Sequence, residues 1–362
     1  MKQKYVWVSA AAFLSIAIAL ALAVYTTGEP GRYLSLYDAG KEVDTFIGTE
    51  HAAEFAPGAP DKDEKPAFHA LSIPALAAWI PDGRNFTVGR LLDDNTAYRR
   101  YYITYESEGL TISGIMNVPK GEGIFPLLLL NHGHIDTAVY TNGRGLKREQ
   151  DYLARRGYVV IHSDYRNHAF SGKDPDTDVN FRLGYAKDVI NAAVAVKMAS
   201  LPFIDAERIG VLGHSMGGGV ALAMMTAKPE LARGYVLFAP VSGDARKNYE
   251  RWMLRRPETA ERIASLYGAP DANPSFWDGI SPVTHLTRTV SPVMIHHGTN
   301  DESVPLEWSE ALAVEMRDAE KNPLLYVYEG EPHEFINAWP LVMQRTTEFF
   351  DMHVRGAASA KK

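Results

Sequence analysis

The chain has 362 residues, of which 46% are hydrophobic and 22% are charged. This composition is ordinary for a globular protein with a large core, so it excludes a chain that is disordered or collagen-like throughout. The net charge of −7 argues against nucleic acid as a partner, because no global positive field would attract a polyanion. Without any cysteine, the protein has no disulfide, no thiolate metal site and no cysteine nucleophile.

The first predicted element is an apolar segment close to the N-terminus. Residues 5–25 carry no charged side chain and follow Lys2 and Lys4. A run of this length can cross about 30 Å of hydrocarbon as a helix, and the preceding lysines favour a cytoplasmic N-terminus. We therefore expect residues 1–25 to be a signal anchor that holds the protein in the membrane, or a cleaved signal peptide that leaves it secreted or periplasmic. A buried core helix is the third interpretation. Both membrane interpretations place the rest of the chain outside the cytoplasm.

Residues 26–98 are predicted to form a tether and a short packed extension. Up to about residue 66 the chain is rich in Gly, Pro, Ala and charged residues, which is typical of a solvated linker. After it, the pattern indicates a helix over residues 71–80.

Residues 99–356 have the rhythm of an α/β domain. Residues 101–105 and 110–118 are predicted to form a hairpin that turns at Glu108 and Gly109. Six short apolar runs follow, as expected for strands buried on both faces of a parallel sheet. These runs are 126–130, 158–162, 209–212, 235–238, 293–296 and 324–328, and they alternate with helical stretches at 145–156, 181–198, 219–227, 307–319 and 338–353. The alternation predicts one doubly wound, mostly parallel sheet with helices on both faces. Residues 245–290 are too long for a simple connection and are predicted to be a helical insertion, or lid.

A strand-turn-helix segment carries the candidate nucleophile. Gly213-His-Ser-Met-Gly217 lies between the apolar run 209–212 and the helical stretch 219–227, which is the context that a G-x-S-x-G nucleophile elbow requires. Such a turn strains the serine backbone. Small residues are needed two positions before and after the serine, because larger side chains there would collide with the neighbouring chain. We predict that Ser215 projects its hydroxyl from the sheet edge beside a helix N-terminus that can stabilise negative charge. A glycine-rich turn without a catalytic role is the alternative.

A serine hydroxyl needs a base, and the base needs a carboxylate that orients it. Where this elbow occurs, the chain order is serine, acid, histidine. Asp301 follows the fifth apolar run and His333 follows the sixth, so both emerge at the same sheet edge as Ser215. We predict that these three residues form a catalytic triad.

Other residues compete for these roles. Asp244 is the rival acid, and Asp301 could instead cap the helix that follows it. A loop histidine without a role is the alternative for His333. Other histidines are weaker candidates for the base. His168 and His214 precede the acid in the chain, and His296 and His297 lie at the end of a strand, where packing is the natural role. These histidines show neither helical ligand spacing nor an acidic cluster nearby, so we expect no metal and no cofactor.

An oxyanion hole is predicted from two backbone N–H groups. One belongs to Met216, directly after the nucleophile, and the other to His134, in the loop after the run 126–130. Gly133 in this loop would permit a close backbone approach. A tight glycine turn without this role is the alternative.

Together these residues resemble the α/β-hydrolase superfamily, most closely the catalytic domain of the prolyl oligopeptidase (S9) family and its dienelactone-hydrolase-like relatives. The resemblance runs from about residue 101 to 354, and it includes segments 114–119, 154–158, 164–166 and 281–283. It implies the α/β-hydrolase fold and serine hydrolase chemistry.

The chain departs from this family pattern at three points. His132-Gly-His134 stands where such peptidases often have His-Gly-Gly. The oligopeptidases carry a β-propeller that screens substrates, and the hundred residues before residue 101 are too few for one. Dienelactone hydrolase uses a cysteine nucleophile, and this chain has none.

The sequence thus favours a serine hydrolase that cleaves carboxylic esters or related acyl compounds through an acyl-enzyme. An S9-like exopeptidase or aminopeptidase is the alternative, and an inactive, membrane-tethered binding protein on a hydrolase fold is the third possibility. The expected partner is a small ester or a short peptide as substrate, with membrane contact through the N-terminal helix if that helix is uncleaved. Aromatic residues of the insertion are candidates to line the acyl pocket, foremost Tyr249, Trp252 and Trp277, although plain packing is their alternative role.

Overall fold

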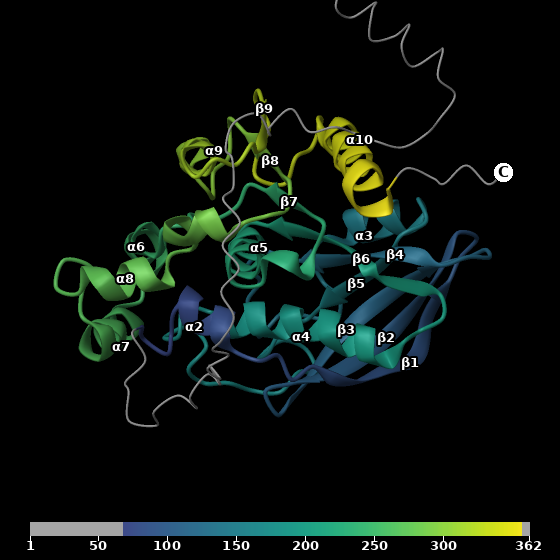
Figure 1. Cartoon of the computed structure of the whole chain (residues 1–362), viewed down its shortest axis with the longest axis horizontal. Coiled ribbons are helices and arrows are strands. Elements are labelled where there is room, and N and C mark those ends of the chain that lie inside the picture. Colours follow the sequence, from purple (N-terminus) through teal and green to yellow (C-terminus); the bar gives the residue numbers. More distant parts are fainter. Residues whose placement is uncertain (1–67, 357–362) are drawn as a thin grey trace, which may run out of the picture. The chain divides into compact units, whose positions relative to one another are not determined.

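The computed structural model describes residues 68–356, so the predicted signal segment and most of the predicted tether lie outside the described residues. A nine-stranded sheet runs through this part of the chain in the order β1-β2-β3-β5-β4-β6-β7-β8-β9 (Figure 1). Between residues 68 and 356, every helix is too short or too polar to span a bilayer.

The strands are β1 (Arg84–Asp94), β2 (Tyr98–Ser107), β3 (Leu110–Pro119), β4 (Phe125–Asn131), β5 (Val159–Ser163), β6 (Ile204–His214), β7 (Gly234–Phe238), β8 (Val293–Gly298) and β9 (Leu324–Tyr328). The α-helices outside the segment between β7 and β8 are α2 (Ile73–Ala78), α3 (Lys147–Ala154), α4 (Leu183–Ala199), α5 (Met216–Ala227), α9 (Leu306–Asp318) and α10 (Trp339–Phe350). All six predicted strands and the predicted hairpin are present, with ends that differ by a few residues. Burial on both faces is confirmed for the first five, but β9 lies at the other edge of the sheet, where Leu324 and Val327 are exposed.

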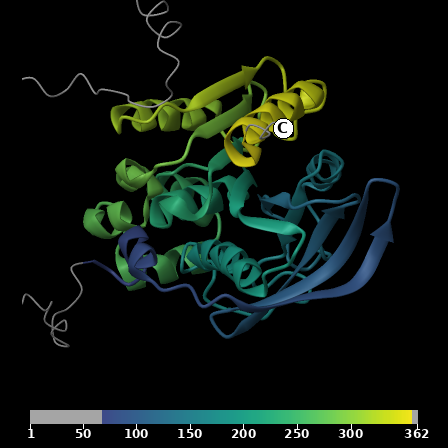
Figure 2. The same ribbon diagram turned by 45° about the vertical axis from the view of Figure 1, so that its right-hand side comes forward.

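One strand was not predicted. β1 lies within residues 26–98, the predicted tether and packed extension, and it pairs antiparallel with β2. Nearly all of its residues are exposed, because β1 is an edge strand; α4 contacts it, but only Phe86 is partly buried against the core. Figure 2 shows β1 and β2 as long arrows that curve along this edge. Since neither face of β1 is buried, its sequence lacks the apolar alternation that marks a strand.

The parallel half of the sheet has a separate core on each face. Alternate side chains of a strand point to opposite faces, so Leu127 and Leu129 of β4 join one core while Leu128 and Leu130 join the other. Helices α4, α5 and α9 cover the first face, and α3 and α10 cover the second. Burial on both faces explains why these strands are apolar without interruption.

The insertion between β7 and β8 is helical, as predicted. It contains α6 (Ala245–Asn248), a π-helical turn (Tyr249–Met253), α7 (Pro257–Tyr267), α8 (Pro274–Ile280) and a 3₁₀ segment (Pro282–Arg288). Its buried residues form a core of their own that includes Tyr249, Phe276 and Trp277.

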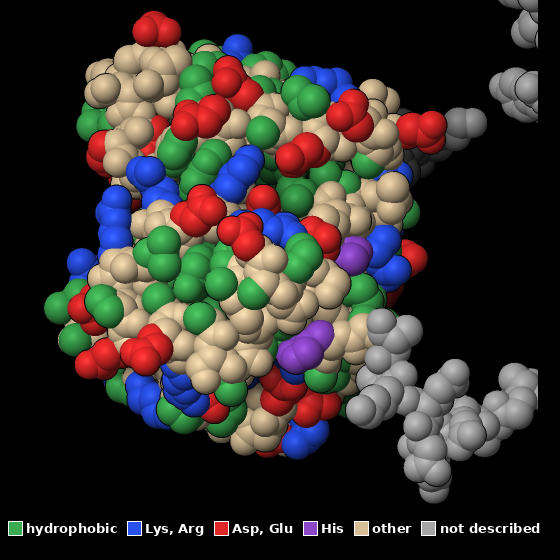
Figure 3. All heavy atoms as spheres, turned by 90° about the vertical axis from the view of Figure 1, so that its left-hand side faces the viewer, with side chains coloured by type: hydrophobic (Ala, Val, Ile, Leu, Met, Phe, Trp, Pro, Cys, Tyr) green, Lys and Arg blue, Asp and Glu red, His purple; other side chains and the backbone are tan. Residues whose placement is uncertain are grey.

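On the face of the molecule that Figure 3 shows, acidic and basic side chains are interspersed among hydrophobic ones.

Candidate active site

Ser215 lies at a strained turn between β6 and α5. Its φ angle is 56° and its ψ angle is −119°, and a non-glycine residue with positive φ costs free energy. The neighbouring strand holds the turn, because the N–H of Ser215 donates to the carbonyl of Phe238 at 2.9 Å. The serine therefore stands at the carboxyl end of the sheet and at the N-terminus of α5, as the sequence predicted.

Close backbone contacts explain the glycines on either side. A Cβ atom on Gly217 would lie 2.0 Å from the carbonyl oxygen of Asn131, and one on Gly213 would lie 2.3 Å from the oxygen of Gly217. The loop after β4 also packs against the nucleophile, since a Cβ on Gly133 would lie 3.2 Å from Cβ of Ser215. The elbow and this loop thus fit together only where side chains are missing.

Asp301 and His333 are brought together from the loops after β8 and β9. The imidazole N–H at Nδ1 of His333 donates to Oδ2 of Asp301 at 2.7 Å. The other carboxylate oxygen accepts the backbone N–H groups of Ser303 and Val304, each at 2.8 Å. Both side chains are buried. This arrangement fixes the ring orientation of His333 and leaves its Nε2 for a proton from a nucleophile.

A second histidine also reaches Asp301. Nε2 of His297 lies 3.1 Å from Oδ2 of Asp301, the same oxygen that His333 contacts. Burial by itself would raise the pKa of the Asp301 carboxyl, but the hydrogen bonds from His297, His333 and the N–H of Val304 hold that pKa well below its usual range. Asp301 is therefore ionised wherever the protein is folded near neutral pH.

Backbone contacts join the acid loop to the histidine loop. The N–H of Asn300 donates to the carbonyl of Glu331 at 3.0 Å. The buried carboxylate of Glu331 accepts the N–H of Ile336 at 2.6 Å, which shapes the turn after His333. From the insertion, Arg251 donates two hydrogen bonds to the carbonyl of Ser303, at 3.0 and 2.7 Å. Contacts among the loop after β8, the loop after β9 and the insertion thus fix the position of Asp301 relative to His333.

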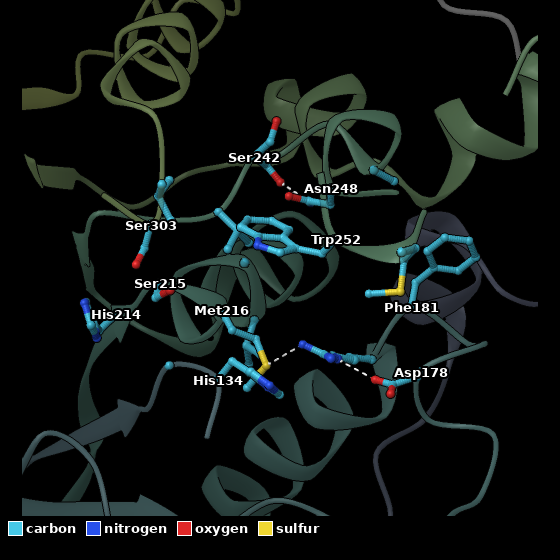
Figure 4. Close-up of a pocket in the computed structure, with 18 of the residues that line it drawn as sticks. His134, Asp178, Phe181, His214, Ser215, Met216, Ser242, Asn248, Trp252 and Ser303 are labelled. Carbon is cyan, nitrogen blue, oxygen red and sulfur yellow. Dashed lines mark hydrogen bonds and ion pairs between the residues drawn. The ribbon is translucent and has the colours of Figure 1, made fainter. Parts of the chain in front are cut away.

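A cavity of about 700 Å³ joins these parts. Ser215, His333, Met216 and His134 all line it, and Figure 4 shows Ser215, Met216 and His134 around the same space. Its size suits a small organic substrate. No hydrogen bond joins Ser215 to His333 within residues 68–356, and such contacts commonly tighten only when substrate binds.

The predicted oxyanion donors lie next to each other on the cavity wall. Met216 is the first residue of α5, where backbone N–H groups have no partner within the helix. His134 lies in the loop after β4, and burial together with the positive charges of Arg182 and Arg256 lowers its pKa to about 4. Its ring is therefore neutral near pH 7, and its surroundings favour negative charge.

The predicted pocket residues separate into two groups. Tyr249 and Trp252 line the cavity. Trp277 instead lies in the core of the insertion, where it is fully buried and its indole N–H donates to the carbonyl of Gly268 at 3.1 Å. The structure corrects its placement, because α8 turns the side chain inward, against Tyr249 and Phe276.

The rival residues have other contacts. Oδ1 of Asp244 accepts the N–H of Arg246 at 2.9 Å, so this carboxylate caps α6. His214 lies beside His333 with ring centroids 4.5 Å apart, and burial lowers its pKa to about 3. Nδ1 of His296 lies 2.7 Å from the hydroxyl of Tyr328. In the part of the chain that the structure describes, no group of three or more His, Asp or Glu side chains is placed to hold a metal ion.

Sequence reasoning missed a group of charged residues on the cavity wall. Asp178, Arg182 and Arg256 line the cavity, the first two from the segment before α4 and the third from the insertion. Asp178 and Arg182 stand four residues apart, a spacing that most often marks a surface ion pair. No motif in the chain points to their position beside Met216.

Comparisons with known proteins place these observations in a family. The model described as "Prolyl oligopeptidase family" matches residues 144–357. The chain is 25% identical over 246 residues to "Uncharacterized peptidase YtmA" of Bacillus subtilis (strain 168), covering 66% of this chain and 87% of that protein. It is 31% identical over 169 residues to "Probable dipeptidyl-aminopeptidase B" of Grosmannia clavigera, of whose length the match spans only 16%.

Solved structures share the fold. The acylaminoacyl peptidase of Pyrococcus horikoshii superposes with a TM-score of 0.57 at 18% identity, over 74% of this chain and 43% of that chain. The acetyl xylan esterase of Paenibacillus sp. R4 superposes with a TM-score of 0.55 at 20% identity, over 78% of this chain and 92% of that chain.

Proposed function

The chain belongs to the prolyl oligopeptidase family, so it is a serine hydrolase, and from this premise we propose that it cleaves carboxylic esters or related acyl compounds through an acyl-enzyme on Ser215. One observation carries the proposal. The strained elbow serine, Ser215, and His333 line the same cavity, and His333 is hydrogen-bonded to the buried Asp301 behind it.

In the acylation step, Oγ of Ser215 attacks the substrate carbonyl while Nε2 of His333 takes the hydroxyl proton. Asp301 keeps the proton on Nδ1 of His333 and stabilises the imidazolium that forms. In this proposal, the N–H groups of Met216 and His134, two residues that line the cavity, bind the oxyanion of the tetrahedral intermediate. His333 then gives its proton to the departing alcohol as the bond between the carbonyl carbon and that oxygen breaks.

In the deacylation step, water repeats this sequence. His333 takes a proton from the water, whose oxygen attacks the acyl-enzyme carbonyl. When the intermediate collapses, Ser215 leaves with the proton from His333, and the carboxylic acid is released. The same two donors serve both oxyanions, so the protein needs no rearrangement between the steps.

Two substrate classes compete. The acetyl xylan esterase supports an ester, because the match spans almost all of that enzyme. The relative named "Uncharacterized peptidase YtmA" supports a peptide substrate instead, because the match covers 87% of its length. We rank the ester first and the exopeptidase or aminopeptidase second, because the dipeptidyl-aminopeptidase and the acylaminoacyl peptidase are matched over only 16% and 43% of their lengths.

We also propose that the enzyme works outside the cytoplasm. The support is the uncharged run at residues 5–25, which follows two lysines and predicts a signal anchor or signal peptide. Cell fractionation of the full chain would test this, and recovery of the full-length enzyme from the cytosol would contradict it.

The central test removes the nucleophile. Wild-type enzyme should be labelled by a fluorophosphonate probe and should hydrolyse short-chain nitrophenyl esters faster than aminoacyl or prolyl arylamides. Ser215→Ala should lose labelling, and its kcat should fall at least about 10³-fold. Ser242→Ala is the matched control, because this cavity serine accepts a backbone N–H of Asp244 and does not stand on the elbow. Undiminished labelling of Ser215→Ala would overturn the proposal, and faster amide turnover would reverse the substrate ranking.

A further inference from the structure

Arg182 presents a guanidinium group to the cavity beside the predicted oxyanion hole. Its Nη1 lies 3.1 Å from Sδ of Met216, the residue whose backbone N–H is a predicted oxyanion donor. A thioether sulfur is a weak acceptor, so this contact uses little of what a charged donor can offer. The Arg182 side chain is 18% exposed, and it lines the cavity together with Ser215. Figure 4 draws the contact as a dashed line that ends at Met216.

Backbone conformation and a carboxylate hold Arg182 in this position. Phe181 and Arg182 are successive non-glycine residues with positive φ angles, 52° and 58°, immediately before α4. Nε of Arg182 donates to Oδ1 of Asp178 at 2.7 Å, while Nη1 of Arg256 donates to Oδ2 of the same residue at 2.9 Å. The guanidinium plane is thus oriented from its Nε side, and its Nη1 is directed to Met216.

The group formed by Asp178, Arg182 and Arg256 keeps a net positive charge after its ion pairs are made. Asp178 carries one negative charge and contacts two arginines, which leaves this group of three residues with one net positive charge. The neighbouring histidine responds to this field, since the positive charges of Arg182 and Arg256 add to burial in lowering the pKa of His134. Phe181 and Met253 also line this cavity and add apolar surface to its wall.

We propose that Arg182 binds a carboxylate of the substrate, so that the enzyme prefers esters of aromatic or aliphatic compounds that bear a negative charge near the scissile bond. A guanidinium group matches a planar carboxylate with two parallel N–H donors. The side chain of Met216 is flexible and can move aside for the ligand. This inference rests on the proposed hydrolase function and adds the class of substrate to it.

The experiment compares charged esters with neutral esters of the same shape. One pair is 4-acetoxybenzoate and 4-acetoxybenzamide, which differ in charge on the leaving group. The other is phenyl hydrogen adipate and its terminal amide, which differ in charge on the acyl group. For the full-length wild-type enzyme, we expect kcat/KM to favour the carboxylate in at least one pair by about tenfold or more, as for a hydrogen bond to a charged group.

Substitutions assign the preference to a residue. Arg182→Gln should bring the preferred pair's ratio of kcat/KM close to one, and Arg182→Lys should keep an intermediate ratio because it retains the charge. Arg208→Gln is the matched control, since Arg208 also pairs with an aspartate, at 2.6 Å, and is 24% exposed, but does not line the cavity. Thermal melting checks that each variant is folded.

The outcomes separate this inference from the function on which it rests. Hydrolysis of the neutral esters without preference in either pair, or a ratio that Arg182→Gln leaves unchanged, would overturn the role of Arg182 alone. No hydrolysis of any of the four esters, together with no fluorophosphonate labelling, would instead overturn the hydrolase proposal.

Discussion

Asp301 receives hydrogen bonds from four sides, and one of the donors is a histidine outside the predicted triad. Nε2 of His297 lies 3.0 Å from the carbonyl of Val304 and 3.1 Å from Oδ2 of Asp301. Both neighbours are acceptors, so Nε2 must carry the proton. Nδ1 then accepts the hydroxyl of Ser309 at 2.7 Å. We infer that His297 is a positioning residue, which acts on His333 through the carboxylate that both rings contact.

Replacing His297 tests this role. His297→Leu removes a donor from Asp301, so the carboxylate becomes more basic and holds the proton on His333 more firmly. We expect kcat to fall about 10- to 100-fold, the range for misplacing a reacting group, with KM nearly unchanged. The acidic limb of the plot of kcat against pH should also move to higher pH. Steady-state kinetics from pH 5 to 9 would measure both effects.

The conservative variant His297→Gln serves as the control. Its amide N–H can reach the same carboxylate oxygen, so it should recover part of kcat and return the acidic limb toward the wild-type position. If His297→Leu is folded and both its kcat and its pH profile match the wild type, His297 has no positioning role.

At the scale of elements, the elbow depends on how closely α5 approaches the loop after β4. Gly217 lies in the first turn of α5, and the atoms that a Cβ there would meet are backbone atoms of Asn131 and His132. Backbone cannot rotate away as a side chain can. The fit between the two segments therefore sets both the position of Ser215 and the stability of the turn.

Gly217→Ala should push these segments apart. We expect a loss of about 3 kcal/mol in the free energy of unfolding, at the upper end for an overpacked site, and a loss of most activity because Ser215 moves. Gly279→Ala is the matched control. The new Cβ there would meet Cβ of Ser72 at an ordinary 3.5 Å, and alanine is the better helix former, so its stability should be equal or higher. Urea unfolding would measure both, and equal stability of the two variants would contradict this account.

The insertion combines structural and cavity-lining aromatic residues within one short segment. Trp277 is fully buried, whereas Trp252 lines the cavity and contacts Trp308 edge to face at 5.4 Å. Trp277 therefore stabilises the insertion, whereas Trp252 contributes to the cavity wall.

Alanine substitutions should separate these roles. Trp277→Ala should cost about 3–5 kcal/mol of stability, as is usual for a large buried aromatic residue. Trp252→Ala should change stability by less than about 1 kcal/mol and should raise KM for an apolar ester several-fold. Calorimetry and steady-state kinetics on both variants would check this. Equal loss of stability would mean that Trp252 is also a core residue.

At the scale of the whole molecule, several histidines are buried in the folded state. Burial lowers the pKa of His132, His214 and His296 to about 3, and that of His162 well below its usual value. An unfolded histidine has a pKa near 6.5. Below pH 6.5 the unfolded chain therefore binds protons that the folded chain does not, so stability falls as the pH falls.

We expect each such histidine to reduce the free energy of unfolding by up to about 1.4 kcal/mol per pH unit below pH 6.5. His162 is the best site for a test, because within residues 68–356 neither ring nitrogen has a hydrogen-bond partner. His162→Phe should be at least as stable as the wild type at pH 7, and at pH 5 its advantage should grow by about 2 kcal/mol. Urea unfolding at both pH values would measure this growth. A difference that stays constant between pH 7 and pH 5 would contradict it.

Local patterns in the sequence were sufficient for the sheet and for the chain order of the site. Five of the six predicted parallel strands were identifiable because burial on both faces requires uninterrupted apolar runs. The sixth, β9, is apolar in sequence as well, although it is an edge strand with exposed residues. Ser215, Asp301 and His333 could be selected as a candidate triad because each follows an apolar run, and parallel strands bring their carboxyl ends to one edge. The exposed strand β1 had no such signal, since only Phe86 of its residues is even partly buried.

Contacts between distant segments decided the rest. His297 meets Asp301 because the loop after β8 folds back toward the strand, and Arg182 meets Met216 because the segment before α4 passes the start of α5. Trp277 lies in a core and Trp252 on the cavity wall, although both are aromatic residues of one insertion. Residue type and spacing determine which groups are available for chemistry at the sheet edge. Which of them share a carboxylate, a cavity or a core depends on packing, since that brings together atoms from segments that have no fixed spacing in the chain.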